Sequence, residues 1–470
     1  MTVRAVPRPE LLLAAACLIF TVAVYYPGYM SPDSVAMLSQ ARTGVTSNVY
    51  SPLMSYVWRV CDHVLPGPGG MLIFQNLVYW LSLAVLAASA TANRLLRCLF
   101  VASGLSIPNF AMLGTLWKDV GMEGFLLATV AASLSAWRLR RVWPLAAAAT
   151  GLFFACGYRQ NAVILAPAMI AIMLYCLSRF HTPPPKIRNN GLLPAYYAGL
   201  GIGVLAALLL PLHLLNNYKI QDARLWSAAM IHDLAGISVF QNANYLPPYV
   251  NRDGLTVSDL KHMYSPLHAN SLFVPSSRKI LGVENPSDKA LSYTLTDAEA
   301  RDLPFYWFTT VVDHFGSYLH HRLLIASRLL VLRTGQPWYP YINGIDLNPF
   351  GLTFHRSRLN AMVNRITEYA AFATPWYSAW AYYVIVTLAA VVSFFWRFRY
   401  AWIVRWLTAS MWLYFLSIFV FGMSGDFRYN IWALACAPLC VFLLLCGARP
   451  DAASKDATPP SAGSPHPARP

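Results

Sequence analysis

The chain has 470 residues, of which 57% are hydrophobic and only 12% carry a charged side chain. Soluble domains carry about 25% charged residues, so this composition excludes an ordinary soluble globule, a coiled coil and a disordered chain. The 14% aromatic content and the net charge of +15 fit an integral membrane protein with Trp and Tyr at its interfaces. The positive charge is therefore expected to contact membrane lipids rather than nucleic acid.

Apolar runs recur along the chain and predict about ten membrane-spanning helices. The first run follows Arg4 and Arg8, as in a signal peptide, but no small-residue cleavage site comes after it, so an uncleaved helix is expected. The predicted fold is an all-α polytopic membrane protein. Its spans lie near residues 10–27, 71–91, 98–115, 120–137, 142–157, 161–178, 192–214, 376–395, 402–422 and 430–447.

The distribution of Lys and Arg predicts the orientation of these spans. With the N-terminus in the cytoplasm, the cytoplasmic loops carry more basic residues than the short loops opposite them at every turn. An even number of spans then returns the C-terminus to the cytoplasm. The predicted organisation is an N-terminal transmembrane module (1–214), an extracytoplasmic loop region between helices seven and eight (215–375), C-terminal spans (376–447) and a disordered cytoplasmic tail (448–470).

Two regions on the far side of the membrane are too long to be simple connectors. The first extracytoplasmic loop, 28–70, is predicted to hold two short helices at 33–42 and 51–65. The second region, 215–375, contains an amphipathic stretch at 305–332. This stretch either lies on the membrane surface or packs as a helix of a soluble subdomain.

Charged residues occur in four short segments on this far side, where polar groups at a membrane edge are costly and often functional. Asp33 follows the first helix, and its simplest structural role is to cap the next helix. Lys118 and Asp119 follow the third span, where they can also form a plain interfacial pair. Arg159 follows the fifth span, and a single Arg at this depth often only reaches toward headgroups.

The polar character continues beside these residues. Gln160 and Asn161 follow Arg159 directly, and amides in so short a turn favour a polar cavity. The last segment, before the tenth span, contains Asp426, Arg428 and Tyr429, which can also be a local ion pair in a loop. Taken together, the Arg and Lys side chains predict a cationic pocket for a phosphate or pyrophosphate, with a carboxylate beside it that accepts a proton from a hydroxyl.

Metal and nucleotide motifs are not found in the sequence. It has no HExxH, no phosphate-cradling P-loop and no GxGxxG after a strand, so no metal ligands are assigned and ATP-driven transport within this chain is not expected. The histidines at His232, His314, His320 and His321 are interpreted as structural.

This layout resembles the GT-C superfamily of integral-membrane glycosyltransferases, and within it the group of protein O-mannosyltransferases and lipid A aminoarabinose transferases. The resemblance is clearest over residues 10–180, and no domain is recognised in 215–375. It is carried by Pro32-Asp33-Ser34 with Ser51-Pro52-Leu53, by Leu116-Trp117-Lys118-Asp119, by Arg159-Gln160-Asn161 and by Asp426-Phe427-Arg428-Tyr429.

The resemblance implies an inverting transfer of a sugar from a polyprenyl-phosphate donor to an extracytoplasmic glycan, lipid or protein. The short tails and the absence of an ER retention signal favour a bacterial inner membrane, and the active site is then expected to face the periplasm or exterior. Asp33 would be the general base, or would bind a divalent metal as in some members, although many members have Asp-Glu where this chain has Asp33-Ser34. Lys118, Arg159 and Arg428 would bind the donor phosphate, supported by Asp119, Gln160, Asn161, Asp426 and Tyr429.

Two other functions stay open at this point. An O-antigen ligase or polymerase would use residues of the late loop, for which Arg322, Arg328, His320 and His321 are candidates. A lipid-linked sugar transporter or flippase would need a cationic cavity without a base, and predicts polar residues deep within several spans.

Overall fold

The computed structural model describes residues 8–47, 49–217, 220–222, 224–278, 288–332, 340–396 and 398–447, so the predicted tail at 448–470 lies outside the described residues. Over the described residues the chain is built almost entirely from helices. The strands found there, β1 (Thr46–Ser47) and β2 (Ile220–Gln221), form one short parallel pair. The predicted all-α class is therefore confirmed.

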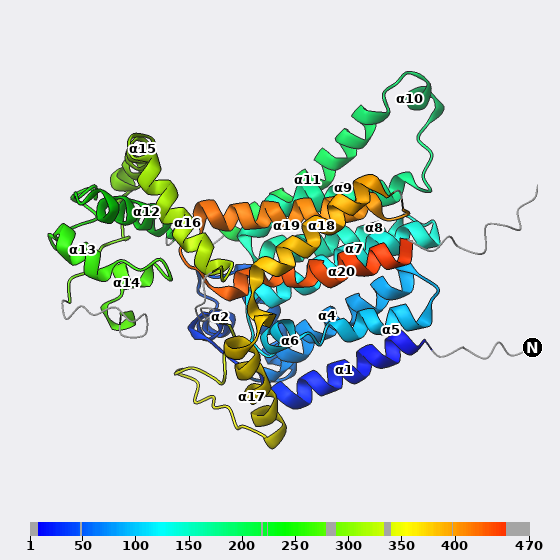
Figure 1. The fold of residues 1–470 in the computed structure, drawn as a ribbon, viewed down its shortest axis with the longest axis horizontal. Helices are drawn as coiled ribbons and strands as arrows, with labels where there is room; N and C mark the ends of the chain where they lie inside the picture. The colour runs from blue at the N-terminus through cyan, green and yellow to red at the C-terminus, as the bar shows by residue number, and fades with distance from the viewer. Residues whose placement is uncertain are drawn as a thin grey trace, which may run out of the picture.

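The apolar helices lie roughly side by side in one bundle (Figure 1). Within the described ranges, six segments are long and apolar enough to cross a bilayer: α4 (Gly69–Ala90), α7 (Lys118–Leu139), Gln160–Ser178, α11 (Leu193–Asn217), α19 (Ala401–Phe421) and Phe427–Gly447. The segment Gln160–Ser178 joins η1 (Gln160–Leu165) to α9 (Ala166–Ser178), and Phe427–Gly447 joins η4 (Phe427–Asn430) to α20 (Ile431–Gly447). Shorter apolar helices are α1 (Pro9–Tyr25), α8 (Trp143–Tyr158) and α18 (Ala379–Phe395). Each predicted span thus falls on helical structure, while the count of ten stays a prediction.

One predicted span is not a single helix. The run at 98–115 is divided between α5 (Arg94–Ser103) and α6 (Ile107–Leu113), which meet at an angle of 65°. Pro108 in the first turn of α6 explains the break, because proline fits the start of a helix but not its interior. The Gln75 side chain donates to the carbonyls of Leu113 (3.2 Å) and Thr115 (3.0 Å), which satisfies backbone groups freed at the end of α6.

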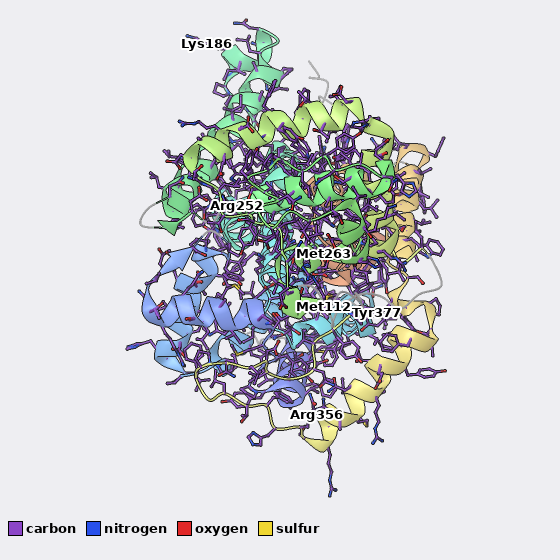
Figure 2. All side chains as sticks on the ribbon, turned by 90° about the vertical axis from the view of Figure 1, so that its left-hand side faces the viewer. Met112, Lys186, Arg252, Met263, Arg356 and Tyr377 are labelled. Atoms are coloured by element: carbon purple, nitrogen blue, oxygen red, sulfur yellow. The ribbon has the colours of Figure 1, made fainter. Side chains whose placement is uncertain are left out.

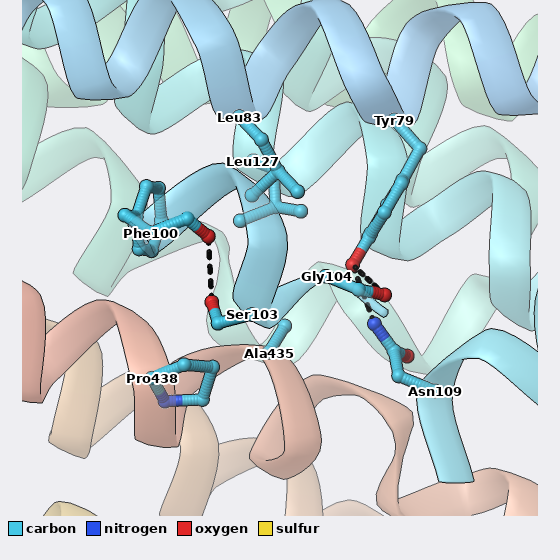
Figure 3. A pocket seen from close by; sticks show the side chains of 9 residues that line it. All are labelled: Tyr79, Leu83, Phe100, Ser103, Gly104, Asn109, Leu127, Ala435 and Pro438. Atoms are coloured by element: carbon cyan, nitrogen blue, oxygen red, sulfur yellow. Dashed lines mark hydrogen bonds between the residues drawn. The ribbon is translucent and has the colours of Figure 1, made fainter. Parts of the chain in front are cut away.

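The break between α5 and α6 borders a small pocket inside the bundle (Figure 3). Its polar groups bond to one another, since the Asn109 amide donates to the Tyr79 hydroxyl at 2.6 Å and the Ser103 hydroxyl donates to the Phe100 carbonyl at 2.6 Å. The pocket is lined by Tyr79, Leu83, Phe100, Ser103, Gly104, Asn109, Leu127, Ala435 and Pro438.

The first long loop contains the two expected helices, α2 (Pro32–Thr43) and α3 (Pro52–Val64). Ser51 begins α3 by accepting from the Met54 N–H (3.0 Å), and its hydroxyl donates to the carbonyl of Gly157 at the end of α8 (2.7 Å). An Arg42–Asp62 ion pair of 2.9 Å links α2 to α3. Both helices are thereby fixed at one end of the bundle.

A lobe with its own hydrophobic core lies at this same end (Figure 1). It is formed by α12 (Leu225–Gln241), α13 (Val257–Met263), α14 (Asn270–Phe273), α15 (Asp297–Asp313) and α16 (Phe315–Leu329). The amphipathic stretch at 305–332 is therefore two helices, broken at His314. Because α16 packs against α12 and α19, it is a packed helix of the lobe rather than a surface helix.

Figure 2 looks onto this end of the molecule. The lobe, marked by Arg252 and Met263, occupies the upper part, and α10 (Pro185–Asn189) with Lys186, which lies at the opposite end of the bundle in Figure 1, is seen behind it at the top. Another helix, α17 (Arg358–Ala373), runs along the lower edge between the labelled Arg356 and Tyr377. It packs against α1 and α6 rather than against the lobe.

Candidate functional site

Asp33 and Arg428, far apart in sequence, form the centre of the predicted site. The Arg428 guanidinium lies 2.8 Å from the Asp33 carboxylate and 3.1 Å from the Asp426 carboxylate. Asp33 keeps 32% of its side-chain surface exposed, whereas Asp426 is buried. One guanidinium therefore holds two carboxylates, of which only Asp33 is partly exposed.

A second ion pair lies beside the first. Arg159 and Asp119 are both buried and approach to 2.6 Å. The Arg159 guanidinium also lies over the ring of Tyr429, 4.5 Å from its centroid. Arg428 in turn lies 5.0 Å from the centre of the Trp117 ring, so aromatic faces separate and orient the two arginines.

Lys118 differs from Arg159 and Arg428 because it forms no direct ion pair with any described residue. It is half-buried at the first position of α7. Within the part of the chain that the structure describes, its ammonium forms neither an ion pair nor a hydrogen bond, although its charge acts on Asp33. A half-buried ammonium that has no direct ion pair is a favourable place for an anion.

The beginning of α2 is capped by serines, not by Asp33. The Ser34 hydroxyl accepts from the Ser31 N–H at 3.3 Å and donates to the Leu116 carbonyl at 2.9 Å. The Ser31 hydroxyl accepts from the Trp117 indole at 2.9 Å. These bonds fasten α2 to the turn that carries Lys118, and they leave the Asp33 carboxylate free for Arg428.

The turn before Asp426 is held by the lobe. Gly425 donates its N–H to the Leu267 carbonyl (2.9 Å), and Ala269 donates to the Met423 carbonyl (2.8 Å). The Ser424 hydroxyl donates to the Asp426 carboxylate, which fixes its orientation. The lobe therefore forms one wall of the site.

The backbone pairing between residues 267–269 and 423–425 places His268 at the site. The sequence analysis did not predict this residue. His268 bridges Ser424 in the backbone, and the charges of Asp426, Arg428 and Asp33 all act on its ring. Its Nδ1 accepts from the Asn270 N–H at 3.0 Å, which puts the hydrogen of the neutral ring on Nε2. No local motif marks His268, because its position depends on contacts between segments more than 150 residues apart.

The electrostatic balance keeps Asp33 ionised. Burial raises the pKa of Asp33, but the charges of Arg428 and Lys118 and the Arg428 hydrogen bond outweigh it and bring the pKa below its ordinary value. Burial lowers the pKa of His268, against the opposing charge of Asp426, so this ring is neutral near pH 7. The site thus combines a carboxylate with a neutral imidazole.

Two predicted supporting residues are not part of this network. Gln160 is exposed and Asn161 is half-buried. Neither side chain forms a hydrogen bond to any residue that the structure describes. The expected polar cavity around these amides is therefore not seen, while Asp33, Lys118, Asp119, Arg159, Asp426, Arg428 and Tyr429 do come together.

The acidic residues do not suit a divalent metal. Asp33 and Asp426 share Arg428, and Asp119 faces Arg159, so each carboxylate already has a cationic partner. Among the described residues, no group of three or more His, Cys, Asp or Glu side chains is arranged to hold a metal ion. The metal seen in some GT-C members does not fit these side chains.

Of the four residues considered for a ligase or polymerase, Arg322 and His321 occupy a different place. His320 is exposed, and Arg328 borders Gly425 in the turn before Asp426. Asp233 of α12 is buried, 2.7 Å from Arg322 and 3.2 Å from His321, and it accepts from the Trp307 indole at 2.9 Å. Arg322 also donates to the Gly422 carbonyl at the end of α19 (2.6 Å). The bond to Gly422 joins the lobe to the bundle, and burial leaves Arg322 and His321 no access to a substrate.

The fold and the site together define an all-α membrane protein with a charged, partly exposed site where its helical bundle meets a separate lobe. No protein-family model matches the chain, and no curated protein or solved structure is detectably similar to it. The resemblance to GT-C enzymes therefore rests on the quoted motifs, and the activity is a proposal.

Proposed function

We propose that the chain is a GT-C type membrane glycosyltransferase that moves a sugar from a polyprenyl-phosphate donor to an extracytoplasmic acceptor. The observation that carries this proposal is the partly exposed Asp33 carboxylate beside Lys118, an ammonium with no ion-pair partner among the described residues. A phosphate would supply the counter-ion, and the carboxylate would supply the base.

The reaction is a single displacement. The acceptor hydroxyl forms a bond to the anomeric carbon of the sugar, the bond from that carbon to the phosphate oxygen breaks, and polyprenyl phosphate leaves with the electron pair. Asp33 takes the acceptor proton as the new bond forms. Attack opposite the leaving group inverts the anomeric configuration.

Arg428 would interact with both the base and the donor phosphate. Its guanidinium holds Asp33 in the structure, and an arriving phosphate would compete for the same N–H groups. Binding of the donor would then loosen the Asp33 ion pair and free the carboxylate for the acceptor. Lys118 and Arg428 would stabilise the negative charge that develops on the leaving phosphate.

The remaining features belong to the same proposal. Ten spans with both termini in the cytoplasm would place the site at the periplasmic or exterior face of a bacterial inner membrane. The lipid tail of the donor would lie among the spans, and the lobe would contact the acceptor. Envelope glycans, glycolipids and proteins are all suitable acceptor classes.

The test uses the full chain in nanodiscs with a panel of polyprenyl-phosphate sugars and acceptors. Asp33→Asn should bind a donor and lose roughly 10²–10⁴-fold in transfer rate, because it cannot accept the proton. The matched control is Asp62→Asn, which removes another carboxylate paired with an arginine at this end of the bundle. This control should transfer at the wild-type rate.

Two outcomes would overturn the assignment. If Asp33→Asn transfers as fast as wild type, Asp33 is not the base. If wild type neither binds nor turns over any donor in the panel, the glycosyltransferase proposal itself is wrong.

A second candidate function is transport of a lipid-linked sugar. The observation that favours it is Glu123, which is buried within α7 and has neither carboxylate oxygen hydrogen-bonded to a described residue. Such a group inside a span is a candidate for a translocation path. Movement of a labelled lipid-linked sugar across proteoliposomes without transfer, lost in Glu123→Gln, would support transport.

A further inference from the structure

The helix α17 buries several polar side chains and exposes large apolar ones. Its buried face carries Asn360, Asn364 and Thr367 together with the smaller apolar residues Val363, Ala370 and Ala371, whereas large apolar side chains on the opposite face are exposed. The exposed residues Met362, Ile366 and Tyr369 are 54%, 49% and 68% accessible. A helix bordered by water would place these faces the other way round.

The polar face is fully used inside the molecule. The Asn360 amide donates to the Val24 carbonyl at the end of α1 (3.0 Å) and also contacts the Tyr29 hydroxyl. The Asn364 amide donates to the same hydroxyl (3.0 Å) and to Asn343 (3.1 Å). These bonds fix the rotation of α17, so its apolar face cannot turn inward.

The apolar face continues into the first turns of α18, a shorter apolar helix that is predicted to be a span. Beyond α17, Trp376 and Trp380 are 50% and 44% exposed, and Trp380 already belongs to α18. Tryptophan at the end of a span is typical of the headgroup region. The outward face of α17 is therefore continuous with the surface that α18 presents to lipid.

Positive charge accompanies this face. Arg358 lies one turn before Met362, and Arg365 lies directly before Ile366; both are exposed, as is one acidic residue, Glu368, so the exposed side of α17 carries a net positive charge. Long cationic side chains can extend to anionic headgroups while their stems cover apolar surface. Figure 2 shows α17 at the periphery of the molecule, where no other described segment covers its outer side.

We propose that α17 is an interfacial membrane helix whose exposed face contacts the lipids of the leaflet at the site's end of the bundle. The residues at 215–375 would then not all be extramembrane, since α17 belongs with the membrane part. This inference does not depend on the proposed enzymatic activity.

The contact has a consequence for the site. Tyr29, which α17 holds through two asparagines, lies four residues before Asp33. The Tyr29 backbone also bonds to Gly114 and Leu116, next to Lys118. A helix seated in the headgroup region would therefore hold the whole charged cluster at the depth of lipid phosphates.

The experiment is lipid photolabelling of the wild-type chain in nanodiscs. A phospholipid with a diazirine in its upper acyl chain is activated, and the labelled peptides are mapped by mass spectrometry. Peptides with Met362, Ile366 and Tyr369 should be labelled at least half as strongly as the α18 peptide with Val384 and Val391, which are exposed on a span. Peptides with Leu347, which is 97% exposed in a loop, should be labelled at least fivefold less.

Labelling of α17 no stronger than that of the Leu347 peptide would overturn the proposal. If α17 is then also protected from hydrogen exchange and the chain is a dimer by mass photometry, a second copy covers the face instead. An Ile366→Glu variant adds an independent readout, because a buried charge in lipid should reduce labelling of α17 while the labelling of α18 is unchanged.

Discussion

At the scale of single residues, the site depends on how many cations surround one carboxylate. Asp33 forms an ion pair with Arg428, and the nearby charge of Lys118 also lowers its pKa. Lys118 itself forms no ion pair in the described part of the chain. The two cations therefore have separable roles. Arg428 orients the carboxylate, and Lys118 chiefly sets how easily it is protonated.

This separation predicts a pH effect for Lys118→Gln. Removing the ammonium takes away a charge that stabilises the Asp33 carboxylate, so the pKa of Asp33 should rise. A base must be ionised, so the acidic limb of the transfer rate against pH should move to higher pH. The profile of kcat/KM from pH 4 to 8 measures this.

The control for this experiment is Lys261→Gln, whose parent side chain bonds to Asn242 in the lobe. Its acidic limb should coincide with that of wild type. An unmoved limb in Lys118→Gln would mean that the limb does not report Asp33. The lowered pKa of Asp33 also affects the stability of the fold. A carboxyl group whose pKa is lower in the folded state stabilises that state at pH values above its unfolded pKa, and this contribution is lost as the pH falls through the folded pKa.

At the scale of elements, the serine cap of α2 determines where Asp33 points. Ser34 bonds both to Ser31 and to the buried Leu116 carbonyl. The cap therefore joins the start of a helix to the turn that bears Lys118. Ser34 therefore stabilises the start of α2 and also holds Asp33 close to the turn that carries Lys118.

Ser34→Ala should lower the free energy of unfolding by roughly 1–2 kcal/mol, because it removes a cap and leaves a buried carbonyl without its partner. Ser39→Ala on the same helix is the control, since its hydroxyl makes no hydrogen bond within the described residues. Equilibrium unfolding in mixed detergent micelles measures both variants. Equal losses in the two would show that the Leu116 contact contributes nothing.

Elements also show what a sequence can predict. A membrane span is a local property of composition, so the apolar runs were all found as helices, and even α2 and α3 were predicted within a few residues. The break at α5 and α6 was missed because the 98–115 run is apolar on both sides of Pro108. The exposed apolar face of α17 was missed because a pattern of apolar residues does not say which side of a helix faces outward.

The site was predictable for a similar reason, and only in part. Turns on one face of a membrane protein are brought near one another by topology alone, so Asp33, Lys118, Arg159 and Arg428 could be grouped in advance. Which carboxylate faces which arginine could not, because it depends on side-chain packing. His268 was out of reach, since only the folded lobe places it beside Ser424.

At the scale of the whole molecule, the lobe and the bundle are joined by a buried charge cluster. Arg322, on the lobe helix α16, pairs with Asp233 of α12 within the lobe and donates to the Gly422 carbonyl of the bundle, and both charged side chains are about 1% exposed. A few residues beyond Gly422, the chain pairs with the lobe and then reaches Asp426 and Arg428. Correct docking of the lobe is therefore a condition for an intact site.

Arg322→Met should destabilise the docked lobe by about 3–5 kcal/mol, because it leaves the Asp233 carboxylate buried without its cation. Arg252→Met is the matched control, since the Arg252–Glu299 pair lies on the lobe surface with Arg252 49% exposed and is expected to contribute less than about 1 kcal/mol. Thermal unfolding and the rate of limited proteolysis within the lobe measure the effect.

A double variant distinguishes lost charge balance from lost packing. Adding Asp233→Asn to Arg322→Met removes the unpaired charge yet keeps an acceptor for the Trp307 indole. If the buried carboxylate causes the loss, the double variant should recover part of the stability and the protease resistance of the lobe. If it is as unstable as the single variant, packing of the Arg322 side chain, rather than its charge, joins the lobe to the bundle.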